Sequence, residues 1–240
     1  MKEYRKPEVS GFRKSNRFPK HNKFPLYFDK KGKRTDFYTL NLTPGEKFFD
    51  EQIKREKGKE YRHFDPGRSK LAAALLKNVS QIGLKEGDNV LYLGASHGYT
   101  PSFISDIVGK KGFVFAVDFA PRVVRDLVFV CEKRVNMAPI MADANHTFEI
   151  GPRIFNVDFV YQDVAQRNQA EIFLKNCKKF LKKEGFGILA VKSRSIDMAA
   201  KPKTIYDQVR KKLEQEVTIV DYRVLDPFEK DHCVFVIKKR

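Results

Sequence analysis

The stretch Asp88-Asn-Val-Leu-Tyr-Leu-Gly-Ala-Ser-His-Gly-Tyr-Thr-Pro101, with the run Phe113-Val-Phe-Ala-Val-Asp-Phe119 that follows it, decides the fold class of this chain. Val90–Leu93 is apolar, too short for a helix, and followed at once by the turn-forming residue Gly94. A short helix is predicted between the two runs, and the second run ends on Asp118. The pattern predicts a buried strand, a glycine turn, a helix and a second strand, with Gly94 and Asp118 at the same edge of a sheet.

Gly94 and Asp118 together favour a nucleoside ligand. A glycine lets a ligand approach the backbone closely, and an acid after the second strand accepts hydrogen bonds from a ribose diol. The turn lacks the G-x-G-x-x-G spacing of dinucleotide sites, because Ser96 stands where the second glycine would meet a pyrophosphate. A cofactor without phosphates does not need that glycine. The turn therefore favours S-adenosylmethionine (SAM) over a nicotinamide dinucleotide.

Further apolar runs alternate with helical patterns beyond this stretch. Strands are predicted at 138–141, 157–161 and 186–191, and such alternation is typical of a parallel sheet flanked by helices. Val217–Val224 and Cys233–Ile237 have no helix between them, which predicts an antiparallel hairpin. We therefore expect an α/β fold, the doubly wound sheet of SAM methyltransferases closed by a C-terminal antiparallel hairpin.

The first part of the chain differs from the rest. Residues 1–60 show short aromatic or apolar runs between turn signals such as Thr43-Pro-Gly45, which predicts a small, basic N-terminal β domain. Lys54–Lys59 is charged apart from one glycine and is expected to be a connection. Residues 61–240 are then assigned to the methyltransferase domain.

The net charge of +17 indicates a polyanionic partner rather than only a soluble surface. Residues 1–34 carry twelve Lys or Arg against three Asp or Glu. Aromatic residues interleave with these basic ones, which favours nucleic acid. They can stack on bases or pack the core of a small sheet, and the sequence leaves both open for Phe12, Phe18, Phe24, Tyr27 and Phe28.

The three cysteines, Cys131, Cys177 and Cys233, form neither a CxxC pair nor a metal-type cluster. We expect buried thiols in a reducing compartment and no metal site. No apolar run reaches the roughly 18 residues that a membrane span needs, and the basic N-terminus lacks the apolar core of a secretion signal. These features predict a cytoplasmic protein.

Four polar residues lie where ligands bind in open α/β sheets. Asp163 follows the fourth strand, Lys192 follows the fifth, His232 opens the last, and Lys70 begins the helix before the first strand. Each also has an ordinary explanation as a helix cap, a solvated strand end, a turn residue or an exposed charge. Asp143, after the third strand, is equally a candidate acceptor for an adenine amino group and a turn cap.

Five segments spread over residues 26–240 resemble the fibrillarin family, and most closely its archaeal fibrillarin-like rRNA/tRNA 2′-O-methyltransferases. They are Asp65-Pro-Gly-Arg-Ser-Lys-Leu-Ala-Ala73, Val90-Leu-Tyr-Leu-Gly-Ala95, Tyr161-Gln-Asp-Val-Ala-Gln166, Val191-Lys-Ser-Arg-Ser-Ile-Asp197 and Pro227-Phe-Glu-Lys-Asp-His232. The resemblance implies SAM-dependent methylation of ribose 2′-hydroxyls in pre-rRNA and tRNA. Neither the Asn/Asp-Pro-Pro-aromatic motif nor the Pro-Cys motif of base methyltransferases occurs in the chain.

The resemblance also implies the residues of the site. A Lys-Asp-Lys-His catalytic set falls on Lys70, Asp163, Lys192 and His232. In the expected mechanism one of the two lysines takes the proton of the 2′-hydroxyl and Asp163 orients Lys192. The expected SAM contacts are Gly94, Ala95, Tyr99, Thr100, Asp118, Phe119, Asp143, Ala144, Asp163 and Gln166.

The chain departs from the usual family pattern at a few positions. Its turn contains Ser96, His97 and Tyr99, where Gly-Ala-Ala-Ser-Gly-Thr-Thr is usual. Phe48-Phe49-Asp50 replaces the common Tyr-Gly-Glu, and Phe64 replaces a Trp. We expect the last two departures to be changes of packing in the N-terminal domain.

The partners that the resemblance implies are a box C/D guide RNA with its target RNA, a Nop-domain scaffold protein and a kink-turn-binding ribosomal-protein homologue. Nucleolar relatives carry a Gly/Arg-rich tail, whereas this chain has only Gly11 and Gly32 before residue 45. That difference favours a cell without a nucleolus. The alternative function is that of a catalytically weak or idle RNA-binding subunit with the same fold.

Overall fold

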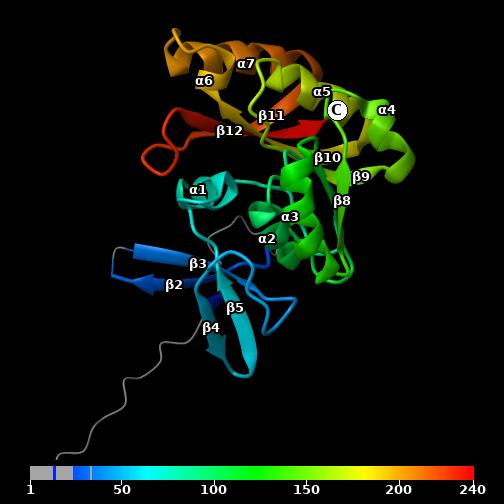
Figure 1. Ribbon diagram of the computed structural model, residues 1–240. Helices are drawn as coiled ribbons and strands as arrows, with labels where there is room; N and C mark the ends of the chain where they lie inside the picture. Colours follow the sequence, from blue (N-terminus) through cyan, green and yellow to red (C-terminus); the bar gives the residue numbers. More distant parts are fainter. Residues whose placement is uncertain (1–12, 15–23, 33) are drawn as a thin grey trace, which may run out of the picture.

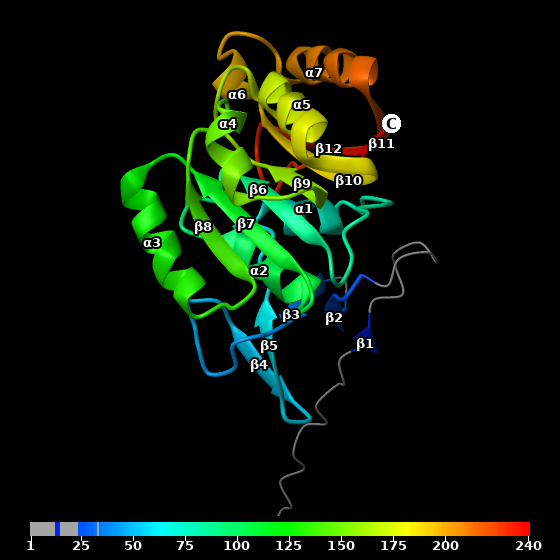
Figure 2. The same ribbon diagram turned by 90° about the vertical axis from the view of Figure 1, so that its right-hand side faces the viewer.

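The computed structural model describes residues 13–14, 24–32 and 34–240. Its strands form two sheets (Figures 1 and 2). The larger sheet has seven strands in the order β11-β12-β10-β9-β6-β7-β8. Strands β6 to β10 are parallel, whereas β12 runs antiparallel to both β10 and β11. The predicted α/β sheet with its closing hairpin is confirmed. Its strands are β6 (Asn89–Leu93), β7 (Phe113–Asp118), β8 (Met137–Met141), β9 (Val157–Gln162), β10 (Leu181–Lys192), β11 (Val217–Val224) and β12 (His232–Lys239).

Helices cover both faces of this sheet (Figure 2). On one face lie α1 (Lys70–Leu76), α2 (Tyr99–Val108) and α3 (Pro121–Glu132). On the other lie α4 (Thr147–Ile150), α5 (Gln169–Phe180) and α7 (Pro202–Glu216). Two short helical segments, η1 (Gly151–Arg153) and α6 (Ser193–Ile196), complete the helices of the described residues.

The apolar runs of the strands divide the core into two layers. Val90 and Tyr92 of β6 pack beneath the α1–α2–α3 face, whereas Leu91 and Leu93 pack beneath the opposite face. Successive side chains of a strand point to opposite faces, so a run without alternation is buried on both sides. This is why the opening stretch is continuously apolar.

A five-stranded antiparallel sheet precedes the larger one, in the order β1-β2-β3-β5-β4. The expected connection over Lys54–Lys59 is wrong, because these residues form most of a hairpin. Its turn is at Lys57 and Gly58, both with positive φ. β5 runs through residue 60, so this sheet continues beyond the predicted division. The strands are β1 (Arg13–Lys14), β2 (Tyr27–Lys31), β3 (Arg34–Leu40), β4 (Ile53–Glu56) and β5 (Lys59–His63).

A buried ion cluster fastens this small sheet to α2. The Arg62 guanidinium, fully buried on β5, donates to Glu51 at 2.8 Å, to Asp106 at 2.8 Å and to Ser102 at 3.0 Å. Arg134, following α3, donates to the other oxygen of Asp106 at 2.8 Å. Burying a charge is costly unless it is paired and hydrogen-bonded, and Arg62 and Asp106 meet both conditions, whereas Nε and Nη2 of Arg134 are buried without a hydrogen-bond partner. The two parts of the chain are thereby held in one arrangement.

Several smaller expectations have an outcome in the fold. Phe24 is buried in the core and Phe28 packs against it, which supports packing rather than base stacking there. Phe12 and Phe18 lie outside the described residues. Phe64 stacks on Phe103, with ring centres 4.5 Å apart, so its departure from the family is a change of packing. The three cysteines are buried and free.

None of the helices in the described part of the chain has the length and apolar character of a membrane span. The described residues also contain no group of three or more His, Cys, Asp or Glu side chains placed to hold a metal ion.

Candidate functional site

A pocket of about 250 Å³ lies at the carboxyl ends of β6, β7, β8 and β9. Ligands of open α/β sheets bind at this edge. Six of the ten expected SAM contacts line the pocket, among them Asp118 and Asp163. Its lining residues are Gly94, Val117, Asp118, Phe119, Ala142, Ala144, Asp163, Val164, Ala165 and Gln166.

Asp118 is held at the pocket by the glycine turn. Its Oδ2 accepts a hydrogen bond from the Ser96 N–H at 2.9 Å, and its Oδ1 accepts one from the Ala120 N–H at 3.1 Å. A carboxylate oxygen has two lone pairs. Each oxygen of Asp118 therefore keeps an acceptor site for a ribose diol while the backbone fixes the carboxyl group.

Gly94 is also required by the packing of the chain itself. Its φ is +82°, and a Cβ built on it would lie 2.3 Å from the carbonyl oxygen of Asp163. The chain itself thus makes a close approach to Gly94, at the end of β9. The Asp163 N–H also donates to the Leu93 carbonyl at 2.9 Å. Gly94 therefore sets how closely the candidate catalytic acid lies to the cofactor turn.

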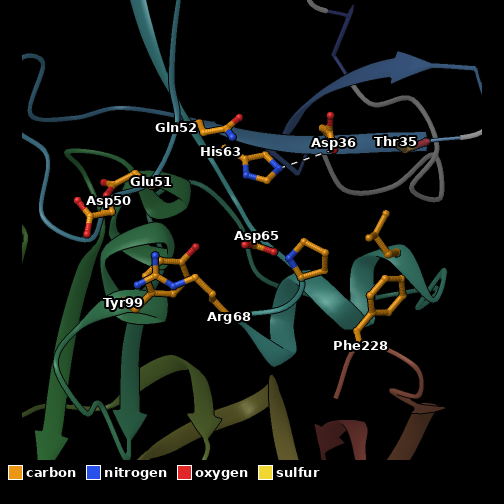
Figure 3. A pocket seen from close by; sticks show the side chains of 12 residues that line it. Thr35, Asp36, Asp50, Glu51, Gln52, His63, Asp65, Arg68, Tyr99 and Phe228 are labelled. Carbon is orange, nitrogen blue, oxygen red and sulfur yellow. Dashed lines mark ion pairs between the residues drawn. The ribbon is translucent and has the colours of Figure 1, made fainter. Parts of the chain in front are cut away.

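The Tyr99 side chain is not on the cofactor side of the turn. It lines a second pocket, of about 640 Å³, between the small sheet, the segment before α1 and the β11–β12 loop (Figure 3). The Arg68 guanidinium lies 4.3 Å from the centre of the Tyr99 ring, and Phe49 meets the ring edge-on at 5.3 Å. The Tyr99 side chain is therefore not among the residues that line the pocket beside Asp118.

The other unusual residue of the turn also lies away from the cofactor pocket. The His97 Nδ1 is 3.0 Å from the Asp126 carboxylate on α3. His97 and Tyr99 thus contact helix and small-sheet residues, and neither is among the residues lining the pocket beside Asp118.

Ala95 and Thr100 lie behind the pocket rather than on its wall. Both are buried, and the Thr100 hydroxyl donates to the Ser69 hydroxyl at 3.1 Å. Ser69 is the N-cap of α1, and its Oγ accepts from the Ala72 N–H at 3.4 Å. The cofactor turn is therefore bonded to the start of the helix that carries Lys70.

Asp143 makes the contacts of a turn cap, which is one of the two roles that the sequence left open. Its Oδ1 accepts from the backbone N–H of Asn145 at 2.8 Å. The Asn145 side-chain amide also donates to Asp143 at 3.1 Å and to Gln166 at 2.7 Å. Asn145, which the sequence did not single out, thus joins the β8 and β9 sides of the pocket. The available signal in the sequence was its place directly after the expected contacts Asp143 and Ala144.

Lys70 and Asp163 come together as an ion pair. The Lys70 Nζ donates to Asp163 Oδ2 at 2.9 Å, and both side chains are mostly buried. Burial lowers the pKa of Lys70, but attraction and hydrogen bonding to Asp163, with Glu229 nearby, outweigh it and raise the pKa above its ordinary value. The partner of the Asp163 carboxylate in the structure is thus Lys70, and its expected role in orienting Lys192 stays a prediction.

Lys192 and His232 lie side by side at the end of the sheet. They are directly paired residues of β10 and β12. The Lys192 side chain is exposed, and among the described residues no carboxylate is within ion-pair distance of its ammonium. The His232 Nδ1 lies 2.6 Å from the Lys230 carbonyl, so this nitrogen carries the hydrogen. A neutral His232 then has Nε2 free to accept.

The residues present fit SAM. Apolar walls from Val117, Ala142 and Val164 face a fixed carboxylate, which is the combination of apolar lining and few polar groups that small-molecule pockets use. No Lys or Arg is among the described residues that line this pocket. Val117 and Ala142 were not singled out from sequence, although both lie at predicted strand ends.

The fold and this site define a class of protein. A seven-stranded sheet of this order, with a closing antiparallel pair and an acidic nucleoside pocket at the strand ends, is the architecture of SAM-dependent methyltransferases. The family model for fibrillarin matches residues 18–240. The chain therefore belongs to the fibrillarin family.

Individual relatives agree with this membership. The chain is 46% identical over 199 residues to the fibrillarin-like rRNA/tRNA 2′-O-methyltransferase of Methanocaldococcus jannaschii, covering 82% of this chain and 86% of that protein. Aeropyrum pernix fibrillarin, in complex with natively bound SAM, has a TM-score of 0.86 at 39% identity, covering 96% and 99% of the two chains. The structure of a fibrillarin/Nop5p complex gives 0.71 at 36% identity, covering 78% and 88%.

Proposed function

We propose that this chain is a SAM-dependent methyltransferase that methylates ribose 2′-hydroxyls of pre-rRNA and tRNA, guided by a box C/D RNA. The observation that carries the proposal is the Lys70–Asp163 ion pair beside a pocket suited to a nucleoside, with Lys192 and His232 on the neighbouring strands. The Methanocaldococcus relative bears the name of this activity, and the Aeropyrum relative binds SAM.

SAM supplies an electrophilic methyl group carried on a sulfonium. Its transfer to a ribose oxygen is an in-line displacement, so the protein contributes mainly by holding the oxygen close to the methyl carbon and aligned with it. Asp118 would hold the ribose diol of the cofactor, and the apolar walls of the pocket would enclose its adenosine. Asp163 lies between this pocket and Lys70, and its negative charge complements the positive methyl donor.

The two lysines have different roles in this proposal. The 2′-hydroxyl is a poor acid, and its proton passes to a base as the new carbon–oxygen bond forms. Lys70 has a raised pKa and stays protonated, donating to Asp163. We therefore assign the role of base to Lys192, whose unprotonated amine would take the hydroxyl proton as SAM supplies the methyl group. His232, directly opposite Lys192 in the β10–β12 pairing, is assigned to orient the ribose.

RNA selection is assigned to partners. We propose that a Nop-domain scaffold, a kink-turn-binding protein and the guide RNA hold the target, because a fibrillarin is known in complex with Nop5p and this chain is strongly basic. The cytoplasmic location, the kink-turn protein and the division into domains near residue 60 remain predictions.

Equilibrium binding of labelled SAM and methylation by a reconstituted particle test the two parts of this proposal. The wild-type chain should bind SAM alone and methylate RNA only with guide and scaffold. Lys192→Ala should keep SAM binding and lose about 10²-fold or more of the methylation rate, the usual contribution of a general base. Retained turnover in this variant would contradict the role of Lys192. Failure of the wild-type chain to bind SAM would favour the idle RNA-binding subunit.

A further inference from the structure

The backbone of Lys192, at the end of β10, is not paired with the neighbouring parallel strand β9. β9 pairs with β10 up to Gln162 and Leu189, and then turns away. On the other side of Lys192, the following residue Ser193 donates its N–H to Asp231 at 3.1 Å. The N–H and C=O of Lys192 itself therefore face α5, where no strand exists to pair with them.

A side chain of α5 takes the place of the missing strand. Gln169, the first residue of α5, is fully buried. Its Oε1 accepts from the Lys192 N–H at 3.1 Å, and its Nε2 donates to the Lys192 carbonyl at 3.2 Å. A primary amide offers the same donor and acceptor as a peptide group. Gln169 thus extends the sheet by one residue pair at the position of the proposed base.

The same residue is bonded to the strand that carries Asp163. The Gln162 side chain, fully buried and adjacent in sequence to Asp163, donates from Nε2 to the backbone carbonyl of Gln169 at 2.7 Å. A continuous chain of hydrogen bonds therefore runs from the end of β9 through Gln169 to the end of β10. It fixes the separation between the segment of Asp163 and that of Lys192.

We propose that Gln169 is a positioning residue for methyl transfer, which sets where Lys192 stands relative to the Lys70–Asp163 pair. The inference rests on the proposed function of Lys192. A misplacement of about 1 Å in a catalytic group can cost on the order of 10²-fold in rate. Removing both hydrogen bonds of Gln169 is expected to act on the chemical step and to leave cofactor binding unchanged.

Gln169→Met keeps the length of the side chain and removes both hydrogen bonds. In the reconstituted particle its single-turnover methylation rate should fall by roughly 10- to 100-fold. The dissociation constant for SAM should stay within about twofold of the wild-type value. A rate within twofold of wild type would overturn the proposal, and so would an equal effect on rate and on SAM affinity. An inactive wild-type particle would instead count against the proposed function.

A matched control lies on the same helix. Asn176 of α5 is also fully buried, but its amide donates to the Ala144 carbonyl at 2.8 Å, on the wall of the cofactor pocket. Asn176→Leu should therefore weaken SAM binding, whereas Gln169→Met should slow chemistry. Identical patterns in the two variants would show only a general loss of structure and would overturn the proposal.

Gln169→Glu provides a test that does not depend on the folding of the Met variant. The ionised carboxylate keeps an acceptor for the Lys192 N–H but faces the Lys192 carbonyl with a second acceptor. A protonated carboxyl restores the donor. The rate of this variant, divided by the wild-type rate at the same pH, should rise as the pH is lowered. A ratio independent of pH would contradict the assigned contacts.

Discussion

At the scale of single residues, Gly94 shows that the fold itself requires a glycine in the turn beside the cofactor pocket. Its positive φ and the Asp163 carbonyl, 2.3 Å from a built Cβ, leave no room for another residue. Gly94→Ala should unfold the site, because backbone strain of about 1 kcal/mol is joined by a steric clash with backbone. Thermal unfolding and SAM binding would both report the loss.

Gly87 is the matched control for this substitution. Its φ is +90°, similar to that of Gly94, but a Cβ there would meet nothing within 4 Å. Gly87→Ala should therefore show the backbone strain alone, about 1 kcal/mol, with SAM binding intact. Equal effects of the two substitutions would mean that the contact between Gly94 and Asp163 does not matter.

The two departures Tyr99 and Phe49 touch each other, and this explains them together. In the usual family pattern these positions carry Thr and Gly, whereas here two aromatic rings meet edge-on and Arg68 covers Tyr99. The resemblance to the fibrillarin family placed Tyr99 at the cofactor. Which side of α2 its ring occupies depends on residues 50 positions away, and no local pattern contains that information.

At the scale of elements, the amino ends of β6 and β9 carry two acids with opposite behaviour. Burial, with repulsion from Asp158, raises the pKa of Asp88 to about 6 against backbone hydrogen bonding. The charged form of Asp88 is thus disfavoured in the folded chain, so its ionisation lowers stability progressively as the pH rises from 3.8 to about 6.

Asp88→Asn should therefore raise the thermal unfolding temperature at pH 7, and this gain should vanish near pH 4. The amide oxygen can still accept from the Lys85 N–H, which Asp88 now binds at 2.8 Å. A gain that does not depend on pH would contradict the burial of a charge at this strand end.

Asp158→Asn is the contrasting variant. Burial raises the pKa of Asp158, but hydrogen bonds from Lys182 and Asn89 outweigh it and lower the pKa overall. The stability from these contacts is present above the ordinary pKa of 3.8 and is lost as the pH falls through the lowered value. This substitution should destabilise at pH 7, with the difference shrinking in strong acid. Thermal unfolding over the same pH range measures both the stabilisation by Asp88→Asn and the destabilisation by Asp158→Asn.

Sequence periodicity placed the elements of the larger sheet well and those of the small sheet poorly. The strands around Gly94 are continuous apolar runs, which only a doubly covered sheet buries. The β4–β5 hairpin, by contrast, is built mostly of charged residues such as Lys54 and Arg55, with one face outward. The run of charged residues was interpreted as a connection between domains, although Tyr61 and Arg62 on the same hairpin are buried.

The catalytic pairing was also beyond sequence pattern. Each of the four expected residues lies at the strand ends or the helix start where it was predicted. The Lys70–Asp163 pair was not predicted, however, because Lys70 and Asp163 are 93 residues apart and meet only through the packing of α1. The Gln169 amide at Lys192 was missed for a similar reason, since a glutamine at a helix start has no distinctive local signal.

At the scale of the whole molecule, the Arg62 cluster makes the small sheet and the methyltransferase sheet one structure. Arg62→Met leaves Glu51 and Asp106 buried with a partner removed, which should cost about 3–5 kcal/mol of unfolding free energy. Denaturant unfolding measures it. The exposed pair Lys212–Glu171 is the control, and Lys212→Ala should cost less than about 1 kcal/mol. Similar costs in both would contradict a structural role for the cluster.

The most direct test of the whole account is to map where the reconstituted particle places a labelled methyl group. Wild-type chain, scaffold proteins and a box C/D guide RNA would be incubated with SAM and target RNA, and the product nucleosides analysed by mass spectrometry. We expect a single methyl on a ribose 2′-oxygen, at a position that moves when the guide sequence is changed. A methyl on a base, or a position independent of the guide, would contradict it.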